Sequence, residues 1–111
     1  MNPAMPRRGL YLVTRESVDT ASLLHTVAQA LTGGVVLVQY RDKSAASALR
    51  LEQARRLVQL CAAHGVPLVV NDDLELAIAA GAAGAHLGEH DADPAHARAR
   101  LGGHEAAGLL G

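Results

Sequence analysis

The sequence is poor in aromatic residues and in net charge. It holds two tyrosines and no Trp or Phe, which leaves almost no platform for stacking single-stranded bases. Ten Lys and Arg stand against 11 Asp and Glu, for a formal net charge of −1. A nearly neutral chain has no overall field to attract nucleic acid or an anionic membrane. We therefore expect no nucleic-acid partner, and any site for an anion must be local.

Cysteine and long apolar runs are also scarce. The single Cys61 has no partner for a disulfide, and its place in a helical pattern indicates a buried core residue. No apolar run reaches the length of about 18 residues that a membrane span needs. Residues 1–9 lack the apolar centre of a secretory signal. These observations favour a cytoplasmic protein with no membrane partner.

The residues that are present alternate between short apolar runs and longer helical patterns. The apolar runs predict strands, the first of them buried on both faces, at residues 9–14, 35–40, 66–70 and 84–88, with a fifth beginning at 108–111. Cap residues and apolar spacing predict helices from 19 to 33, from Ser44 to about 65, over 74–80 and from 93 to 101. The predicted buried stripe of the second helix is Leu51, Ala54, Leu57, Val58 and Cys61. Strands that alternate with helices predict an α/β fold with a parallel sheet, in a single domain over residues 1–111.

Charged and polar residues follow three successive predicted strands, at residues 39–43, 71–73 and 89–91. Ligands of parallel α/β folds bind beyond the carboxyl ends of the strands, so these residues are expected on one rim. Asp72 and Asp91 then become neighbours able to share Mg²⁺, which takes one or two carboxylates and completes its shell with water and phosphate oxygens. Arg41 adds a guanidinium that can make bidentate hydrogen bonds to the same phosphates, and Lys43 adds a compact positive charge. The combination indicates a diphosphate bound with Mg²⁺.

Each of these residues also has a simpler interpretation. Asp72 or Asp73 can cap the following helix, and one of the pair can cap while the other binds. Arg41 and Lys43 can be a solvated loop pair, and Asp91 an ordinary turn residue. Their joint placement at three consecutive strand ends favours a site.

One motif is rejected on its context. Residues 86–90 match the H-x-x-E-H pattern of zinc proteases. That motif needs a helix to bring both histidines to one face, whereas His86 falls in a predicted strand and Gly88 lies between His86 and His90. We therefore expect His86 to pack at a strand end.

Four segments together resemble the thiamine phosphate synthase family: residues 9–14, the Gln-x-Arg-x-Lys pattern at 39–43, Asn-Asp-Asp at 71–73 and residues 86–91. The resemblance implies a (β/α)8 (TIM) barrel, here a partial barrel of about four βα units and the start of strand five. It also implies a transferase that joins hydroxymethylpyrimidine diphosphate to a thiazole phosphate, giving thiamine phosphate and releasing diphosphate. By the same resemblance the pyrimidine diphosphate is bound by Gln39, Arg41, Lys43 and Asn71, and Mg²⁺ by Asp72 and Asp91.

Two features depart from that family. Glu89 stands where the family usually has Gln, which places one more carboxylate beside the metal. The chain stops at strand five, although such barrels typically need about 250 residues. We therefore expect the 111-residue chain alone to be inactive, and we expect the open edges of its sheet to promote self-association.

Two alternatives to a coupling enzyme remain open at this point. One is an inactive half-barrel that retains Mg²⁺ and diphosphate binding. The other is a relative on the same fold that handles the thiazole. The second alternative is disfavoured by residues that serve the diphosphate partner, namely Gln39, Arg41, Lys43, Asp72 and Asp91.

Overall fold

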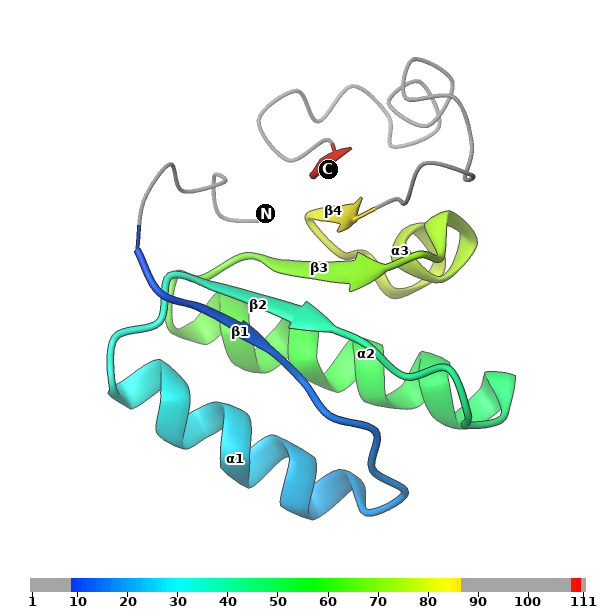
Figure 1. The fold of residues 1–111 in the computed structure, drawn as a ribbon, viewed down its shortest axis with the longest axis horizontal. Helices are drawn as coiled ribbons and strands as arrows, with labels where there is room; N and C mark the ends of the chain where they lie inside the picture. The colour runs from blue at the N-terminus through cyan, green and yellow to red at the C-terminus, as the bar shows by residue number, and fades with distance from the viewer. Residues whose placement is uncertain (1–8, 87–108, 111) are drawn as a thin grey trace.

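Strands and helices alternate along the chain in a computed structural model, which describes residues 9–86 and 109–110 (Figure 1). The strands are β1 (Tyr11–Val13), β2 (Leu37–Tyr40), β3 (Leu68–Asn71), β4 (Gly84–His86) and β5 (Leu109–Leu110). The helices of the described part are α1 (Thr20–Thr32), α2 (Ser47–Ala63) and α3 (Leu74–Ala80). None of these three helices is long and apolar enough to cross a membrane. The predicted helix at 93–101 lies outside the described residues.

All described strands are parallel, and they lie in the sheet in the order in which they occur in the chain. Right-handed crossovers between such strands place every connecting helix on the same side of the sheet. Figure 1 shows α1 and α2 side by side on one face, with the strand arrows pointing the same way. A sheet that grows in one direction without reversal matches half of a barrel and differs from a doubly wound nucleotide-binding sheet, whose strand order reverses. The α/β prediction is confirmed.

The first strand departs from its prediction. Tyr11 and Val13 are each 49% exposed, although we expected a strand buried on both faces. Leu12, between them, packs against the core. The reason is the one-sided cover of the sheet: helices bury alternate residues of β1, and the residues between them project from the opposite face.

The beginning of α2 also differs from its prediction. Ser44 does not cap this helix, which starts at Ser47 with Ala46 as its N-cap and no side-chain cap bond. The buried Asp42 carboxylate explains the difference, because its Oδ1 accepts hydrogen bonds from the Ser44 and Ala45 N–H groups at 2.9 Å and from the Ser44 hydroxyl at 3.2 Å. The hydroxyl that was expected to cap the helix therefore donates to Asp42.

The core lies between the sheet and the helices. On α2 it takes in Ala54, Leu57 and Cys61, with Leu51 and Val58 partly buried against it, as the apolar spacing predicted. Cys61 is fully buried, and burial raises the pKa of its thiol to about 12. A thiol with so high a pKa stays protonated at neutral pH, so Cys61 is a packing residue, as expected.

A buried polar network joins β2 to both neighbouring helices. The Tyr40 hydroxyl donates to Gln53 Oε1 at 2.6 Å. Gln53 Nε2 donates to the Ser17 carbonyl at 2.7 Å and to Thr20 Oγ1 at 3.2 Å. Burial, and next the Asp42 carboxylate, raise the pKa of Tyr40 to about 12 against the opposing effect of Arg50. The network ties the end of β2 to the segment that joins β1 and α1, and so fixes where both loops leave the sheet.

Replacing Gln53 with Ala should lower the free energy of unfolding by about 2 to 4 kcal/mol, because it leaves the buried Tyr40 hydroxyl without a partner and removes the donor to the Ser17 carbonyl. Urea unfolding at pH 7 measures the change. Gln59→Ala is the matched control, since Gln59 is exposed on the same helix and surface substitutions usually change stability by about 0.5 kcal/mol or less. Equal effects of the two substitutions would contradict the structural role of Gln53.

Asp42 should make stability depend on acid. Burial alone would raise its pKa, but the Ala45 and Ser44 N–H groups and the Ser44 hydroxyl outweigh burial and hold the pKa below its ordinary value of 3.8. A lowered pKa in the folded state contributes stability that is complete above 3.8 and is lost as the pH falls through the folded pKa. Asp42→Asn keeps an acceptor without the charge and should cost about 1 kcal/mol at pH 7.

Urea titrations between pH 7 and pH 2 check this expectation. The stability difference between wild type and Asp42→Asn should shrink below the ordinary Asp pKa of 3.8. A difference that stays constant or grows as the pH falls would show that the Asp42 charge is not the source.

Candidate functional site

The carboxyl ends of β2, β3 and β4 bring two of the predicted site residues, Gln39 and Asn71, close to His86. Gln39 lies on β2, where it is paired in register with Val69 of β3. Asn71 is the last residue of β3, two positions after Val69, so its side chain is on the same face as that of Gln39. Asn71 is paired in turn with His86 on β4. The side chains of Gln39, Asn71 and His86 therefore lie on one face of the sheet, opposite the residues that pack on the helices.

These three side chains form a continuous chain of hydrogen bonds. Gln39 Nε2 donates to Asn71 Oδ1 at 2.9 Å, and Gln39 Oε1 lies 3.0 Å from His86 Nδ1. Gln39 is only 7% exposed, whereas Asn71 and His86 are half-buried. His86 packs at a strand end, as expected. Its contact with Gln39 was not foreseen, because nothing in the sequence reports the lateral alignment of β2 with β4.

Asp72 follows β3 in an unusual backbone conformation. Its φ of 54° lies in the left-handed region, and its N–H donates to the His86 carbonyl at 2.7 Å. Left-handed backbone is uncommon outside glycine, although Asp and Asn adopt it more readily than other residues. The turn separates the side chain of Asp72 from that of Asp73, so the two neighbouring carboxylates have different environments.

The carboxylate of Asp72 lies against a cation. Lys43 Nζ is 3.2 Å from Asp72 Oδ2. The two side chains are 56% and 36% exposed. Contact between residues 29 positions apart shows that the loops after β2 and β3 meet at the sheet edge, as the sequence predicted. An exposed pair of this kind contributes little to stability.

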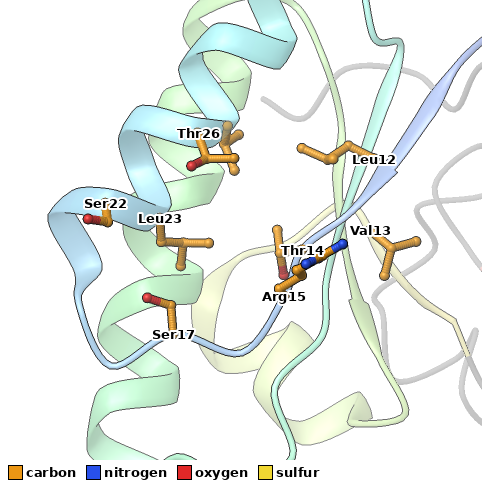
Figure 2. Close-up of a pocket in the computed structure, with 9 residues that line it drawn as sticks. Leu12, Val13, Thr14, Arg15, Ser17, Ser22, Leu23 and Thr26 are labelled. Atoms are coloured by element: carbon orange, nitrogen blue, oxygen red, sulfur yellow. The ribbon is translucent and has the colours of Figure 1, made fainter.

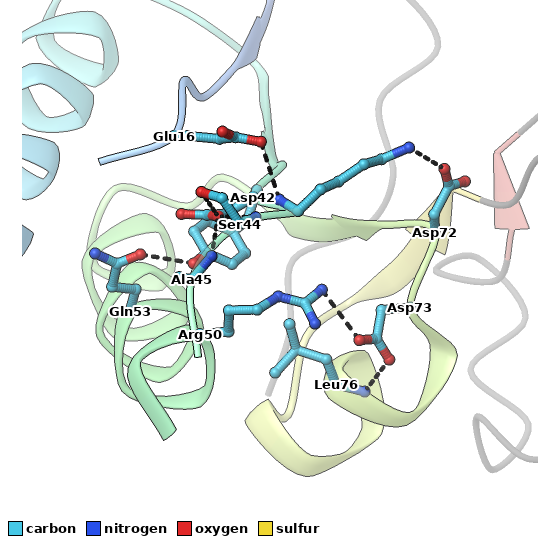
Figure 3. Close-up of polar contacts among 11 residues, drawn as sticks. Glu16, Asp42, Ser44, Ala45, Arg50, Gln53, Asp72, Asp73 and Leu76 are labelled. Carbon is cyan, nitrogen blue, oxygen red and sulfur yellow. Dashed lines mark hydrogen bonds and ion pairs between the residues drawn. The ribbon is translucent and has the colours of Figure 1, made fainter. Parts of the chain in front are cut away.

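Asp73 takes the capping role. Its Oδ1 accepts from the Leu76 N–H at 2.9 Å, and its Oδ2 lies 3.1 Å from Arg50 Nη2 (Figure 3). One of the two aspartates thus caps α3 and pairs with α2, while the other faces Lys43. Asp73 therefore takes the capping role that the sequence left open for either aspartate, whereas binding by Asp72 stays a prediction.

Two residues of the segment after β1 hold the Arg41 to Lys43 loop. Thr14 Oγ1 accepts from the Arg41 N–H at 3.0 Å, and Glu16 Oε1 accepts from the Lys43 N–H at 3.1 Å. The Arg41 side chain itself is exposed. The sequence analysis did not identify Thr14 or Glu16 as site residues; their position just beyond the first strand was the only available signal.

Asp91, Glu89 and His90 lie outside the described residues, so the pairing of Asp72 with Asp91 and the departure at Glu89 stay predictions. The donor available in the described part suits Mg²⁺, since a partly exposed carboxylate is the hard oxygen ligand that this ion takes. That carboxylate contacts the Lys43 ammonium at 3.2 Å, and the described residues contain no group of three or more His, Cys, Asp or Glu that could hold a metal ion.

A separate pocket of about 230 Å³ lies between β1 and α1 (Figure 2). Leu12, Leu23, Val27 and hydroxyl groups line it, and Arg15 is the one charged residue among its described lining. None of the six predicted site residues belongs to that lining. A mostly apolar hollow of this composition does not suit a diphosphate.

Comparison with known proteins identifies relatives over almost the whole chain. The family model of thiamine monophosphate synthase matches residues 10–109. The thiamine-phosphate synthase of Xylella fastidiosa strain Temecula1 is 51% identical over 109 residues, which cover 97% of this chain and 46% of that protein. The enzyme of Thiobacillus denitrificans is 56% identical over 94 residues, covering 85% of this chain and 44% of its own length. The chain thus spans about half the length of these relatives.

A solved structure supports the same assignment. Thiamine phosphate pyrophosphorylase from Pyrococcus furiosus superimposes with a TM-score of 0.71 at 28% identity, over 82% of this chain and 44% of that one. This likeness confirms the predicted fold class, a partial barrel of the (β/α)8 family. The resemblance inferred from the sequence motifs is likewise confirmed. By the match of the family model over residues 10–109, the chain belongs to the thiamine monophosphate synthase family.

Proposed function

We propose that this chain provides the pyrimidine diphosphate and Mg²⁺ side of a thiamine phosphate synthase site. The reaction is the transfer of a hydroxymethylpyrimidine group from its diphosphate to a thiazole phosphate, giving thiamine phosphate and free diphosphate. The observation that carries the proposal is the meeting of Lys43, Asp72, Asn71 and Gln39 at the carboxyl edge of the sheet. Family membership and this shared edge support the same conclusion.

The reaction requires neutralisation of the negative charge on the leaving diphosphate more than it requires an acid or a base. The bond between the pyrimidine methylene carbon and a diphosphate oxygen breaks, and the diphosphate leaves with the electron pair. The thiazole nitrogen then donates its lone pair to the methylene carbon, which forms the new bond. Negative charge develops on the leaving oxygen, so preorganised positive groups stabilise the transition state.

Each residue then has a definite role. The Arg41 guanidinium and the Lys43 ammonium contact diphosphate oxygens. Gln39 and Asn71 bind the pyrimidine diphosphate through their amides, while Asp72 and Asp91 hold Mg²⁺. The metal, when bound, supplies a divalent charge that neutralises the leaving diphosphate.

The anchoring of the Arg41 to Lys43 loop supports this assignment. Two side-chain acceptors, Thr14 Oγ1 and Glu16 Oε1, hold the backbone N–H groups of Arg41 and Lys43 at 3.0 and 3.1 Å. Within the loop, the buried Asp42 carboxylate accepts from the Ala45 N–H at 2.9 Å. A loop backbone held in this way fixes the points from which the exposed Arg41 and Lys43 side chains project before substrate binds. Preorganisation of this kind reduces the entropy that binding costs.

The second candidate function is binding without coupling. The chain spans about 46% of the Xylella relative, so about half of that protein has no counterpart in these 111 residues. A chain that contains the groups for one of two substrates retains Mg²⁺ and diphosphate binding and does not couple. A direct assay for thiamine phosphate separates this candidate from a chain that couples the two substrates by itself.

Two further expectations belong with the proposal. The half-exposed Tyr11 and Val13 on β1 support self-association through the open sheet. The lone thiol of Cys61 supports a reducing, cytoplasmic compartment.

Calorimetry with the pyrimidine diphosphate and Mg²⁺ should detect binding by the folded chain. Asp72→Asn should weaken it at least about tenfold, since it removes the carboxylate charge at the metal. Asn tolerates left-handed backbone, so the fold at φ 54° is preserved. Arg41→Ala should cause a similar loss.

Matched controls keep the charge changes and move them away from the site. Glu52→Gln and Arg55→Ala alter exposed residues of α2, and affinity should stay within about twofold of wild type because solvent screens distant charges. No binding by folded wild type, or equal losses in the controls, would refute the proposed site.

The coupling assay has its own expected result. The 111-residue chain, given both substrates and Mg²⁺, should form no thiamine phosphate above the uncatalysed background, because it covers the pyrimidine diphosphate side alone. Chromatographic detection of thiamine phosphate measures this directly. Turnover that disappears in Asp72→Asn would instead show that these residues suffice for catalysis.

A further inference from the structure

His86 lies where it can set the direction of the hydrogen bonds in the site. It ends the described part of β4 and is paired in register with Asn71. Its ring nitrogen Nδ1 is 3.0 Å from Gln39 Oε1, across a strand of the sheet. Gln39 is nearly inaccessible to solvent, at 7% exposure, so its amide depends on protein partners.

The direction of these bonds follows from elementary chemistry. An amide oxygen accepts and cannot donate, so contact with Gln39 Oε1 requires the proton of His86 to be on Nδ1. The nitrogen of the same Gln39 amide then faces Asn71 and donates to Asn71 Oδ1 at 2.9 Å. The Asn71 oxygen is thereby engaged. No hydrogen bond to Asn71 Nδ2 is found within residues 9–86.

We infer that His86 is a positioning residue, whose Nδ1–H fixes the Gln39 amide and, through it, turns the Asn71 NH₂ group toward the ligand. The inference rests on the proposed function, because it assigns a chemical role to Asn71 within the pyrimidine diphosphate site. Asn71 then presents two N–H donors and recognises acceptor atoms, such as diphosphate oxygens or a ring nitrogen. Its oxygen already accepts a hydrogen bond from Gln39, so the NH₂ group is the end of Asn71 that is available to the ligand.

The opposite arrangement has opposite chemistry. If both amides were reversed, Asn71 Nδ2 would donate to Gln39 Oε1 and Gln39 Nε2 would donate to an unprotonated His86 Nδ1. The Asn71 oxygen would then face the ligand and would suit a metal ion or a donor group. A single proton on the His86 ring therefore decides whether Asn71 serves an anion or a cation.

The first test needs no ligand and so is independent of the proposed function. Two-dimensional ¹H–¹⁵N spectra that correlate ring nitrogens with ring carbon protons distinguish the two neutral tautomers of a histidine. The wild-type chain should show His86 with the proton on Nδ1, and the signal should be absent in His86→Asn. A neutral ring that carries its proton on Nε2 would overturn the inference.

The second test compares two substitutions that imitate different ring nitrogens. The amide nitrogen of Asn falls near the position of Nδ1, and that of Gln falls near Nε2. His86→Asn therefore keeps the donor to Gln39, whereas His86→Gln removes it. In calorimetry with the pyrimidine diphosphate and Mg²⁺, His86→Gln should weaken binding about tenfold, the effect of one hydrogen bond to a charged ligand.

His86→Asn should keep the affinity within about threefold of wild type, less than the loss of one such hydrogen bond. Far-UV circular dichroism and urea unfolding establish that both variants fold. Equal losses in the two variants, or a greater loss in His86→Asn, would contradict the positioning role. If wild type binds no ligand, the proposed site fails, and the tautomer measurement still decides the direction of the hydrogen bonds.

Discussion

The parallel order of the strands is the constraint on which the rest of the structure depends. Because each strand is added next to the preceding one, every strand ends at the same edge and every described helix covers the same face. The strand order alone therefore places residues that are far apart in the sequence next to one another at this edge. The 3.2 Å approach of Lys43 to Asp72 and the bond between Gln39 and Asn71 are direct consequences.

Structural and candidate functional groups share this edge but have separate tasks. Asp42 and Asp73 are used by the fold: one organises the loop before α2, and the other caps α3 and pairs with Arg50. Lys43 and Asp72 remain at the surface, where an exposed ion pair adds little stability. Groups that the fold does not need are the ones available for a ligand, and the left-handed turn at Asp72 separates the two kinds of aspartate.

The sequence predicted the succession of elements well, since apolar runs and Gly or Asp boundaries are local signals. Helix α3, capped by Asp73 and ended by the left-handed Gly81, lies where local chemistry placed it. Errors arose where the outcome depends on contacts that an apolar pattern does not report. The exposure of Tyr11 and Val13 depends on which face the helices cover, and Ser44 lost its capping role to a buried carboxylate two residues away. Gln53 and His86 were missed as polar partners because their contacts cross elements.

The central claim is that the carboxyl edge of this sheet binds a diphosphate with Mg²⁺. A crystal structure of the chain with Mg²⁺ and inorganic diphosphate tests it most directly. The account predicts diphosphate density beyond the ends of β2 and β3, in contact with Arg41 and Lys43, and a metal ion on Asp72. Diphosphate bound instead in the pocket between β1 and α1, with the strand ends unchanged, would contradict it.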